Sequence, residues 1–388
     1  MKKKRLGTYV KCSVTGESYQ AYIPSFLPFQ PPLELNNHHL ELMEEANRRL
    51  GRLDAFGNFF PNKNLFLRSY IRKEALLSSQ IEGTQSSFSD LLLYESDQTP
   101  GVPLDDVQEV SHYIQAMTYG LKRLREGFPI CSRLIKEIHA ILLSGSRGSQ
   151  KSPGEFRRTQ NWIGGTRPGN AMFVPPPADQ VESCMGNLEN FLNDIPEKTP
   201  LLIKAALAHV QFETIHPFLD GNGRLGRLLI TLLLCSEGAL EEPLLYLSLY
   251  FKKNRSTYYN FLQEIRKTGD WEAWLSFFLE GVSITAEEAT LTAQKIINLF
   301  EEDRKKIETL GRAAATALQV HHILKTHPLV THGLLSKELK VSKPSLSLAT
   351  SHLKKLGVLE EMTGRTRNQI FIYKNYIEIL KEGAEPIH

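Results

Sequence analysis

The spacing of apolar residues along the chain predicts a mainly helical protein. Leu67, Ile71 and Leu76, for example, share one face of a helix expected over residues 64–80. Glycine and proline interrupt the same periodicity at intervals, and the segments between them predict further helices. They cover residues 37–53, 86–94, 105–126, 132–143, 180–193, 200–214, 223–236, 256–267 and 270–310. The predicted strand content is too small for an α/β fold, so we expect an all-α core.

Two segments depart from the helical pattern. Residues 22–34 contain four prolines and predict an extended arm, because each proline restricts the residue before it. Residues 145–177 are rich in glycine, proline and asparagine. Within them, extended pieces at 159–163 and 171–174 flank a glycine-rich connection, which predicts a small β-hairpin flap on the helical body.

The pattern changes again at residue 313. Three short helices and then two short strands are predicted, with Arg365 and Arg367 in the connection between the strands. The helices cover residues 316–325, 334–339 and 343–356, and the strands cover 358–362 and 369–373. Three helices followed by a β-hairpin resemble a winged helix-turn-helix domain.

Composition narrows the class of protein without naming a function. The chain has 388 residues, of which 41% are hydrophobic and 23% charged, values that exclude wholesale disorder and a fibrous fold. The longest apolar run, residues 228–235, is far shorter than the ~20 residues of a membrane helix. The basic N-terminus is not followed by an apolar segment, so we expect no signal peptide, a cytoplasmic protein and no membrane partner.

Cysteine spacing and charge add two further expectations. The four cysteines lie more than 50 residues apart, which predicts reduced core residues and argues against a disulfide scaffold or a zinc site. Net charge is +3, but residues 313–388 hold ten Lys/Arg and six Asp/Glu, which gives +4 there. This bias is a weak indication of an anionic partner for the C-terminal region.

The stretch H-P-F-L-D-G-N-G-R-L-G-R at residues 216–227 carries the candidate chemistry. Gly221 and Gly223 allow successive backbone N–H groups to converge on an anion where the next helix begins. Asp220 supplies a carboxylate of the kind that Mg²⁺ on a polyphosphate requires. Arg224 and Arg227 share a helix face and can clamp phosphates, and His216 is placed to take a proton from a hydroxyl.

A simpler interpretation exists for each residue alone. Asp-Gly and Asn-Gly are common turns, Asn222 can be a plain N-cap, and arginines often occupy helix ends. The complete stretch, however, matches the H-x-F-x-[D/E]-G-N-G-R-x-x-R signature of Fic-domain proteins, which it closely resembles. That resemblance implies transfer of AMP from ATP to a tyrosine, threonine or serine hydroxyl of a target protein.

The resemblance also implies a role for each residue of the motif. His216 would be the general base and Asp220 the Mg²⁺ ligand. The remaining residues would bind ATP: Gly221, Asn222 and Gly223 in the anion hole, Arg224 on the phosphates, and Arg227 on the γ-phosphate.

Two further matches extend the resemblance. G-E-F-R at 154–157 and N-W-I-G at 161–164 resemble the Fic flap, which implies that Trp162, Ile163 and Gly164 dock the target by strand addition. Tyr258 and Tyr259 resemble residues of the helix that faces adenosine, which implies contact with the nucleotide; the alternative for each is core packing.

An upstream motif, S-S-Q-I-E-G at residues 78–83, fits the [S/T]-x-x-x-E-[G/N] inhibitory motif of Fic proteins. Ser78, Glu82 and Gly83 are its fixed positions. The resemblance implies that Glu82 pairs with Arg227 and so excludes the γ-phosphate; Glu82 could also orient a water that removes AMP. The alternative is that Glu82 is a solvated residue at a helix end, where a negative charge is slightly unfavourable.

Taken together, these features predict an N-terminal region with the inhibitory helix (1–110), a Fic core (111–285), a helical linker (286–312) and a winged-helix-like domain (313–388). The expected partners are ATP, a target protein, and DNA or a protein at the C-terminal domain; a homodimer is left open. An alternative function is a DNA-binding regulator whose Fic core senses nucleotide, although the third helix offers few base-reading groups. His139, His209, His321 and His322 are expected to be structural.

Overall fold

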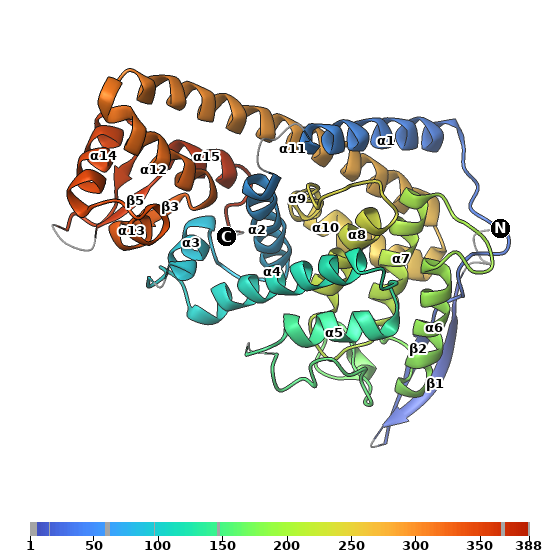
Figure 1. The fold of residues 1–388 in the computed structure, drawn as a ribbon. Coiled ribbons are helices and arrows are strands. Elements are labelled where there is room, and N and C mark those ends of the chain that lie inside the picture. Colours follow the sequence, from blue (N-terminus) through green and yellow to red (C-terminus); the bar gives the residue numbers. More distant parts are fainter. Residues whose placement is uncertain are drawn as a thin grey trace.

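In a computed structural model, the chain is described over residues 6–14, 16–58, 63–96, 98–145, 148–365 and 369–386. The fold is mostly helical, as predicted, and one long helix, α11 (Trp271–Glu308), runs along the molecule (Figure 1). The other helices before it are α1 (Asn37–Asn58), α2 (Lys63–Ile81), α3 (Phe88–Glu95), α4 (Leu104–Arg125), α5 (Ser132–Leu142), α6 (Val181–Leu192), α7 (Leu201–Ile215), α8 (Asn222–Ser236), α9 (Ser248–Lys253) and α10 (Arg255–Thr268).

The centre of the core is α7, whose side chains are buried on every face. A helix that is apolar all round fits only where neighbours surround it, and α6, α8, α10 and α11 pack against α7. On the side of α11, Trp274 is fully buried and its indole Nε1 donates a hydrogen bond of 2.9 Å to the Ala206 carbonyl oxygen. The loop that carries the sequence motif therefore begins and ends on core helices, α7 and α8.

The N-terminal residues form a β-hairpin that the sequence analysis did not predict. Strands β1 (Thr8–Val14) and β2 (Glu17–Ile23) pair antiparallel, with Thr8 opposite Ile23 and Val14 opposite Glu17. Gly16 lies in the connection with a φ of +85°, a conformation that glycine adopts at little cost. The extended arm expected from residue 22 onward thus begins as a strand and becomes irregular after Ile23.

The predicted flap hairpin is reduced to a single bridge. Only Ile163 and Phe173 pair across the two expected pieces. The rest of the second piece turns elsewhere, because the Val174 carbonyl oxygen accepts a hydrogen bond from the backbone N–H of Tyr22 in β2. Short turns of 3-10 helix occupy Pro168–Asn170 and Ala178–Gln180 in this region.

The C-terminal region contains the predicted three helices and hairpin, with additions. Its helices are α12 (Ala314–Thr326), after the 3-10 turn Gly311–Ala313, then α13 (His332–Leu339), α14 (Lys343–Lys355) and α15 (Lys374–Lys381). Strands β3 (Leu329–Thr331), β4 (Glu360–Glu361) and β5 (Ile370–Ile372) form an antiparallel sheet in the order β3-β5-β4. The strand β3 and the helix α15 were not predicted, and Arg367 of the predicted hairpin tip lies outside the described residues.

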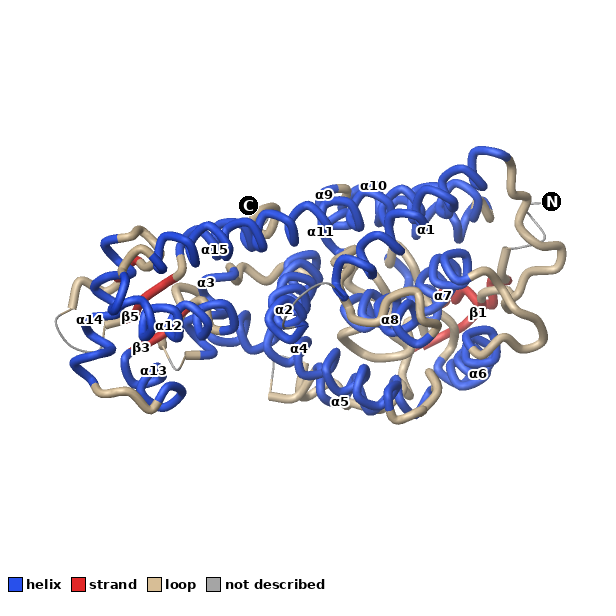
Figure 2. The backbone as a smooth tube through the Cα atoms, turned by 45° about the horizontal axis from the view of Figure 1, so that its top comes forward, coloured by secondary structure: helices blue, strands red, loops and turns tan. Residues whose placement is uncertain are grey.

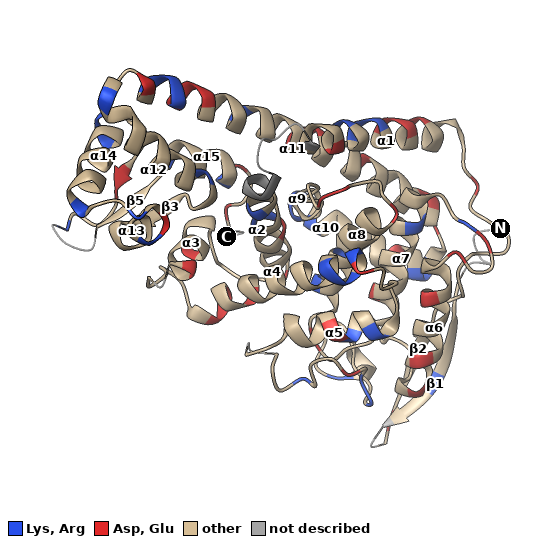
Figure 3. Ribbon diagram, viewed as in Figure 1, with Lys and Arg blue, Asp and Glu red and all other residues tan. Residues whose placement is uncertain are grey.

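Helix α11 joins this region to the core without a break. It crosses residue 285, so the expected linker is the second half of a helix whose first half packs on α7 and α1. Figure 2 shows the C-terminal helices at one end of α11 and the β1–β2 hairpin towards the other. Acidic residues alternate with basic ones along the outer half of α11, as Figure 3 shows.

The C-terminal region also contacts α2. The Ser69 hydroxyl lies 2.9 Å from the Tyr376 hydroxyl, and Gln80 Nε2 donates to the Ala384 carbonyl oxygen at 3.0 Å. In the same segment, Lys252 of α9 donates a hydrogen bond to the carbonyl oxygen of Glu385. The last described residues therefore lie between the core and the helix that ends with the S-S-Q-I-E-G motif.

Two expectations about composition can be compared with the structure. All four cysteines are free thiols, and of these Cys184 is fully buried while the other three are partly exposed. Among the helices that the structure describes, none combines the length and apolar character needed to span a membrane.

The first prediction concerns the contact between α11 and α7. Replacing Trp274 by Ala should lower the free energy of unfolding by about 3–5 kcal/mol, because it opens a cavity and leaves the Ala206 carbonyl without its donor. Chemical denaturation followed by circular dichroism measures this. The matched variant Trp162→Ala removes an indole that is 39% exposed and should change the unfolding free energy by less than about 1 kcal/mol. Equal effects of the two substitutions would contradict the packing described.

Candidate active site

Two residues in left-handed conformations shape the loop between α7 and α8. His216 ends α7 with φ 49° and ψ 60°, and Gly221 precedes α8 with φ 75°. Histidine is among the residues that tolerate this region better than most, and glycine enters it freely. As a result, the chain leaves α7, turns within a few residues and points the first N–H groups of α8 towards the loop.

Asn222 closes this loop on itself. Its side-chain Oδ1 accepts a hydrogen bond of 2.9 Å from the Phe218 N–H, and its Nδ2 donates one of 2.9 Å to the Phe218 carbonyl oxygen. Asn222 is the first residue of α8, so the plain N-cap interpretation is wrong: Gly221 holds the cap position. With its amide engaged in this way, Asn222 fixes the shape of the anion nest, the set of backbone N–H groups expected to bind an anion at residues 221–223.

His139 of α5 supports the loop from one side. Its ring stacks on Phe218 at 3.7 Å between centroids, and its Nδ1 accepts a hydrogen bond of 2.8 Å from the Gly154 N–H. The proton must then sit on Nε2, which donates to the Asp220 carbonyl oxygen at 3.0 Å. Burial lowers the pKa of His139 to about 4, so the ring is neutral. The prediction of a hydrogen-bonded structural histidine is confirmed.

The flap supports the loop from the other side. Arg157 is 3% exposed, and its guanidinium donates to the carbonyl oxygens of His216 at 2.9 Å and Pro176 at 2.6 Å. Asn161 Nδ2 donates to the Phe218 carbonyl oxygen at 2.9 Å. Both residues belong to the predicted flap motifs, but no role was predicted for either. In the structure they connect the flap to the loop by hydrogen bonds.

His216 is a neutral imidazole in this setting. Burial lowers its pKa to about 4, and the nearby charge of Arg266 acts in the same direction. Nδ1 lies 3.4 Å from the Glu213 carbonyl oxygen, which can only accept, so the proton is assigned to Nδ1. This leaves the lone pair of Nε2 able to receive a proton.

Asp220 and Arg224 form a second polar group beside the nest. Asp220 Oδ1 accepts a hydrogen bond of 2.6 Å from the Gly221 N–H and lies 3.9 Å from Arg224 Nη2, while its side chain stays 45% exposed. Arg224 Nη1 also bonds Glu109 Oε2 of α4 at 3.1 Å. Glu109 was not predicted, since nothing local in the sequence distinguishes it from the other acidic residues of that helix.

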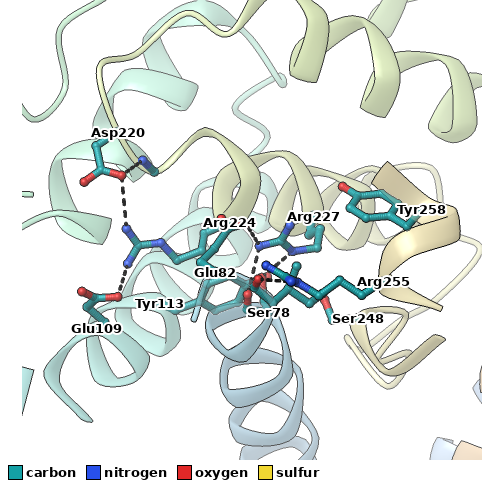
Figure 4. Close-up of polar contacts among 12 residues, drawn as sticks. Ser78, Glu82, Glu109, Tyr113, Asp220, Arg224, Arg227, Ser248, Arg255 and Tyr258 are labelled. Atoms are coloured by element: carbon teal, nitrogen blue, oxygen red, sulfur yellow. Dashed lines mark hydrogen bonds and ion pairs between the residues drawn. The ribbon is translucent and has the colours of Figure 1, made fainter. Parts of the chain in front are cut away.

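The predicted pair between Glu82 and Arg227 is present (Figure 4). Arg227 is 2% exposed, and its Nη2 donates to Glu82 Oε1 at 2.6 Å. Its remaining bonds run to Ser78: Nε to the hydroxyl and Nη2 to the carbonyl oxygen, both at 2.9 Å. Burial would raise the pKa of Glu82, but the charge and hydrogen bond of Arg227 outweigh it and hold that pKa below its ordinary value.

The end of α2 is fixed where it meets this pair. Arg255 Nε donates to the Ile81 carbonyl oxygen at 3.1 Å, and Gly83 turns the chain away with a φ of +106°. A Cβ at position 223 would collide with the Glu82 carboxylate, so the motif glycine is also what allows Glu82 to approach. Glu82 is therefore held against the nest, although 35% of its side chain remains exposed.

The two tyrosines differ in accessibility. Tyr258 is 1% exposed, and its hydroxyl lies 2.8 Å from Nε2 of the buried His209, which favours the core interpretation for both residues. Tyr259 is 38% exposed, and the guanidinium carbon of Arg255 lies 5.3 Å from the centroid of the Tyr259 ring. Of the pair, Tyr259 is the one whose ring a nucleotide can reach in this arrangement.

Two of the three flap residues expected to dock a target, Trp162 and Gly164, are exposed. Trp162 is 39% exposed, Gly164 has a φ of 69°, and Met172 opposite them is 72% exposed. Ile163 donates a backbone hydrogen bond of 2.8 Å to Phe173 and accepts one of 3.1 Å from it. The prediction that these residues dock a target stays a prediction.

Two family models and several curated proteins match this chain. The Fic/DOC family N-terminal model matches residues 40–122, and the Fic/DOC family model matches residues 129–234. The curated "Protein adenylyltransferase Fic" of Drosophila grimshawi is 30% identical over 229 residues, which cover 59% of this chain and 44% of that protein. The protein of the same name from Drosophila melanogaster is 32% identical over 181 residues, which cover 46% of this chain and 34% of that protein. The chain thus spans less than half the length of these relatives.

Solved structures agree in fold. A Fic family protein from Desulfovibrio desulfuricans G20 superposes with a TM-score of 0.58 at 20% identity, over 89% of this chain and 98% of that one. Fic-1 (residues 134–508) from C. elegans superposes with a TM-score of 0.50 at 22% identity, over 67% of this chain and 74% of that one. The first of the two matched segments contains α2 and Glu82, and the second contains Arg227 on α8. The chain therefore contains the N-terminal and Fic domains of the Fic/DOC family.

Proposed function

We propose that the protein transfers AMP from ATP to a hydroxyl side chain of a target protein, and that Glu82 inhibits this transfer in the same chain. The observation that carries the proposal is the buried Arg227 beside an anion nest, paired at 2.6 Å with a carboxylate from another helix. The curated relatives are named protein adenylyltransferases, which supports the reaction class.

The loop offers what transfer of a nucleotidyl group needs. The N–H groups at the start of α8 and the two motif arginines would hold the phosphates, because a helix N-terminus and guanidinium groups both favour anions. Nε2 of His216 would take the proton of the attacking hydroxyl as its oxygen bonds to the α-phosphorus. The bond from that phosphorus to the bridging oxygen would break, and pyrophosphate would leave.

A divalent cation fits beside this site. Asp220 presents a partly exposed carboxylate next to the nest, and Mg²⁺ commonly takes one or two carboxylates together with phosphate oxygens and waters. No cluster of three or more His, Cys, Asp or Glu side chains occurs in the described ranges, so the phosphates would supply much of the coordination. When bound, Mg²⁺ would neutralise charge on the leaving phosphates.

Inhibition follows from the occupation of Arg227. Its guanidinium has donors directed at Glu82 and Ser78, so a γ-phosphate would have to replace the Glu82 carboxylate to reach it. ATP bound without that contact would place its α-phosphorus differently, and orientation alone can change rates by orders of magnitude.

A DNA-binding role for the C-terminal region remains the alternative function. On α14 the exposed side chains include Lys343, Ser347, Leu348 and Ser351, and none of these is an Arg, Asn or Gln that reads base edges well. Duplex binding that weakens steeply with added salt would favour this alternative.

The test of AMP transfer compares two parallel reactions, one with ATP labelled on the α-phosphate and one with ATP labelled on the γ-phosphate. Label transferred only from the α-phosphate indicates AMP transfer, and label transferred from the γ-phosphate indicates kinase activity.

Replacing His216 by Ala should lower AMP transfer by about 10²–10⁴-fold while leaving the fold intact, since the substitution removes the proton acceptor. Initial rates of α-phosphate labelling measure the effect, and binding of a fluorescent ATP analogue shows whether the nucleotide site survives. Labelling at the wild-type rate would exclude His216 as the base.

Asp220→Ala should abolish labelling at Mg²⁺ concentrations that saturate the wild type, because the carboxylate beside the nest is lost. A Mg²⁺ titration at fixed ATP is the measurement, and any residual activity should need at least about tenfold more metal. An unchanged Mg²⁺ requirement in the variant would show that Asp220 is not a ligand.

Glu82→Gly should raise AMP transfer, including self-modification, by about 10- to 100-fold, the range expected when a charge-assisted hydrogen bond is released to the substrate. Arg227→Ala should not activate, and the double variant should resemble Arg227→Ala. Deleting a carboxylate from an enzyme seldom activates it, so the direction of the change is informative.

The matched control for Glu82 is Glu242→Gly. Glu242 also pairs with an arginine, Arg125, at 2.6 Å, but it is not part of the nest. We expect labelling by this variant at the wild-type rate. Unchanged or reduced labelling by Glu82→Gly would refute the inhibitory role while leaving the catalytic loop untouched.

A further inference from the structure

We propose that a cavity between α2, α11 and the C-terminal segment binds a small anion, a phosphate- or carboxylate-bearing molecule, with Lys73 as its central cation. The cavity has a volume of about 380 Å³, within the range of small-molecule sites. Leu291 on its wall is 50% exposed, so the cavity opens to solvent. It shares no lining residue with the loop of residues 216–227.

Lys73 is the unusual feature of this cavity. Its side chain lies on α2 and is 2% exposed, and its ammonium group sits 4.6 Å from the centroid of the Tyr246 ring. Within the described part of the chain, no hydrogen bond or ion pair to this ammonium group occurs. A buried charge without a hydrogen-bonded partner is costly, and the face of one aromatic ring offsets only part of that cost.

The other charged groups of the cavity do not supply the missing partner. Glu288 bonds Lys253 at 2.9 Å, and Glu382 bonds Lys295 at 2.7 Å. Both carboxylates are thus committed to lysines, and the cavity lining keeps one positive charge in excess. Glu382, Glu288 and Glu385 all act on Lys73 through their charges, but within the described residues none of them bonds its ammonium group.

The state of Lys73 suits an anion. Burial lowers its pKa to about 8, so the group is still mostly cationic at neutral pH but is poorly stabilised by its surroundings. Thr292, Gln294 and Asn298 line the same cavity and offer neutral hydrogen-bonding groups to the oxygens of a phosphate or carboxylate. An anion bonded to the ammonium group would therefore complete an otherwise unbalanced site.

The cavity lies close to the residues of the proposed inhibition, but the proposal of an anion site does not depend on that inhibition. Lys73 lies nine residues before Glu82 on α2, and Glu382 and Gly383 of the C-terminal segment form part of the wall. A bound anion would hold that segment and α2 together. Binding can be measured without any AMP transfer, so the failure of one proposal leaves the other standing.

Thermal unfolding of the full chain in inorganic phosphate or sodium acetate, at constant ionic strength set with chloride, tests the site. Each bound anion should raise the Tm of the wild type by linkage, and Lys73→Met should lose that part of the increase, with an affinity reduced about tenfold or more. Any anion held by the 216–227 loop contributes equally to both proteins and cancels in the comparison. The control is Lys325→Met, since Lys325 also lies over a ring, that of Phe300, but outside the cavity.

A second pair of variants covers the case in which Lys73→Met does not fold. Leu291→Glu places a negative charge on the exposed wall and should weaken anion binding, whereas Leu104→Glu, at the same 50% exposure on α4, should not. A Tm increase with phosphate but not with acetate would assign the site to phosphate-bearing ligands. A Tm increase with both probes would show that the site accepts phosphate and carboxylate groups alike. No increase in the wild type, or the same increase in all variants, would overturn the proposal.

Discussion

The burial of the Arg227 guanidinium is the constraint on which the candidate site depends. A guanidinium that is almost wholly removed from water needs acceptors for its donors, and here Ser78 and Glu82 at the end of α2 accept hydrogen bonds from Nε and Nη2. Any ligand that takes the place of Glu82 must bring a comparable negative charge, which restricts the candidates to groups such as a phosphate. The same constraint explains why Gly223 has no side chain, since the carboxylate occupies the space beside it.

The loop itself is held in place before any ligand arrives. His139 bonds the Asp220 carbonyl, Arg157 bonds the His216 carbonyl, and Asn222 bonds both backbone groups of Phe218. These bonds occupy carbonyl oxygens and the Phe218 N–H, and they leave N–H groups at the start of α8 for an anion. Groups that are fixed in advance need little reorganisation when charge develops near them, which is how polar sites gain their effect.

The sequence predicted those parts of the molecule that local patterns encode. Helical periodicity located most of the helices, and the motif located the loop, because both depend on residues within a few positions of one another. The pairing of Arg224 with Glu109 joins residues 115 positions apart and left no local trace. The pair of Glu82 and Arg227, 145 positions apart, was predicted only because the motif resembles that of a known family. Helices α9 and α15 and strands β1, β2 and β3 were not predicted. Of these, α9 and β3 are so short that they hold few periods of any pattern.

The position of the last described residues has a practical consequence for handling the protein. Gln80, two residues before Glu82, donates from one amide nitrogen to the carbonyl oxygens of both Ser86 and Ala384. Figure 1 shows the C-terminus beside α2 and the N-terminus at the far side of the molecule. We therefore expect an affinity tag or a fluorescent fusion at the C-terminus to disturb the contact between Ala384 and Gln80, close to Glu82, and so to change the rate of AMP transfer. The same tag at the N-terminus would extend from the side of the β1–β2 hairpin and leave that helix undisturbed.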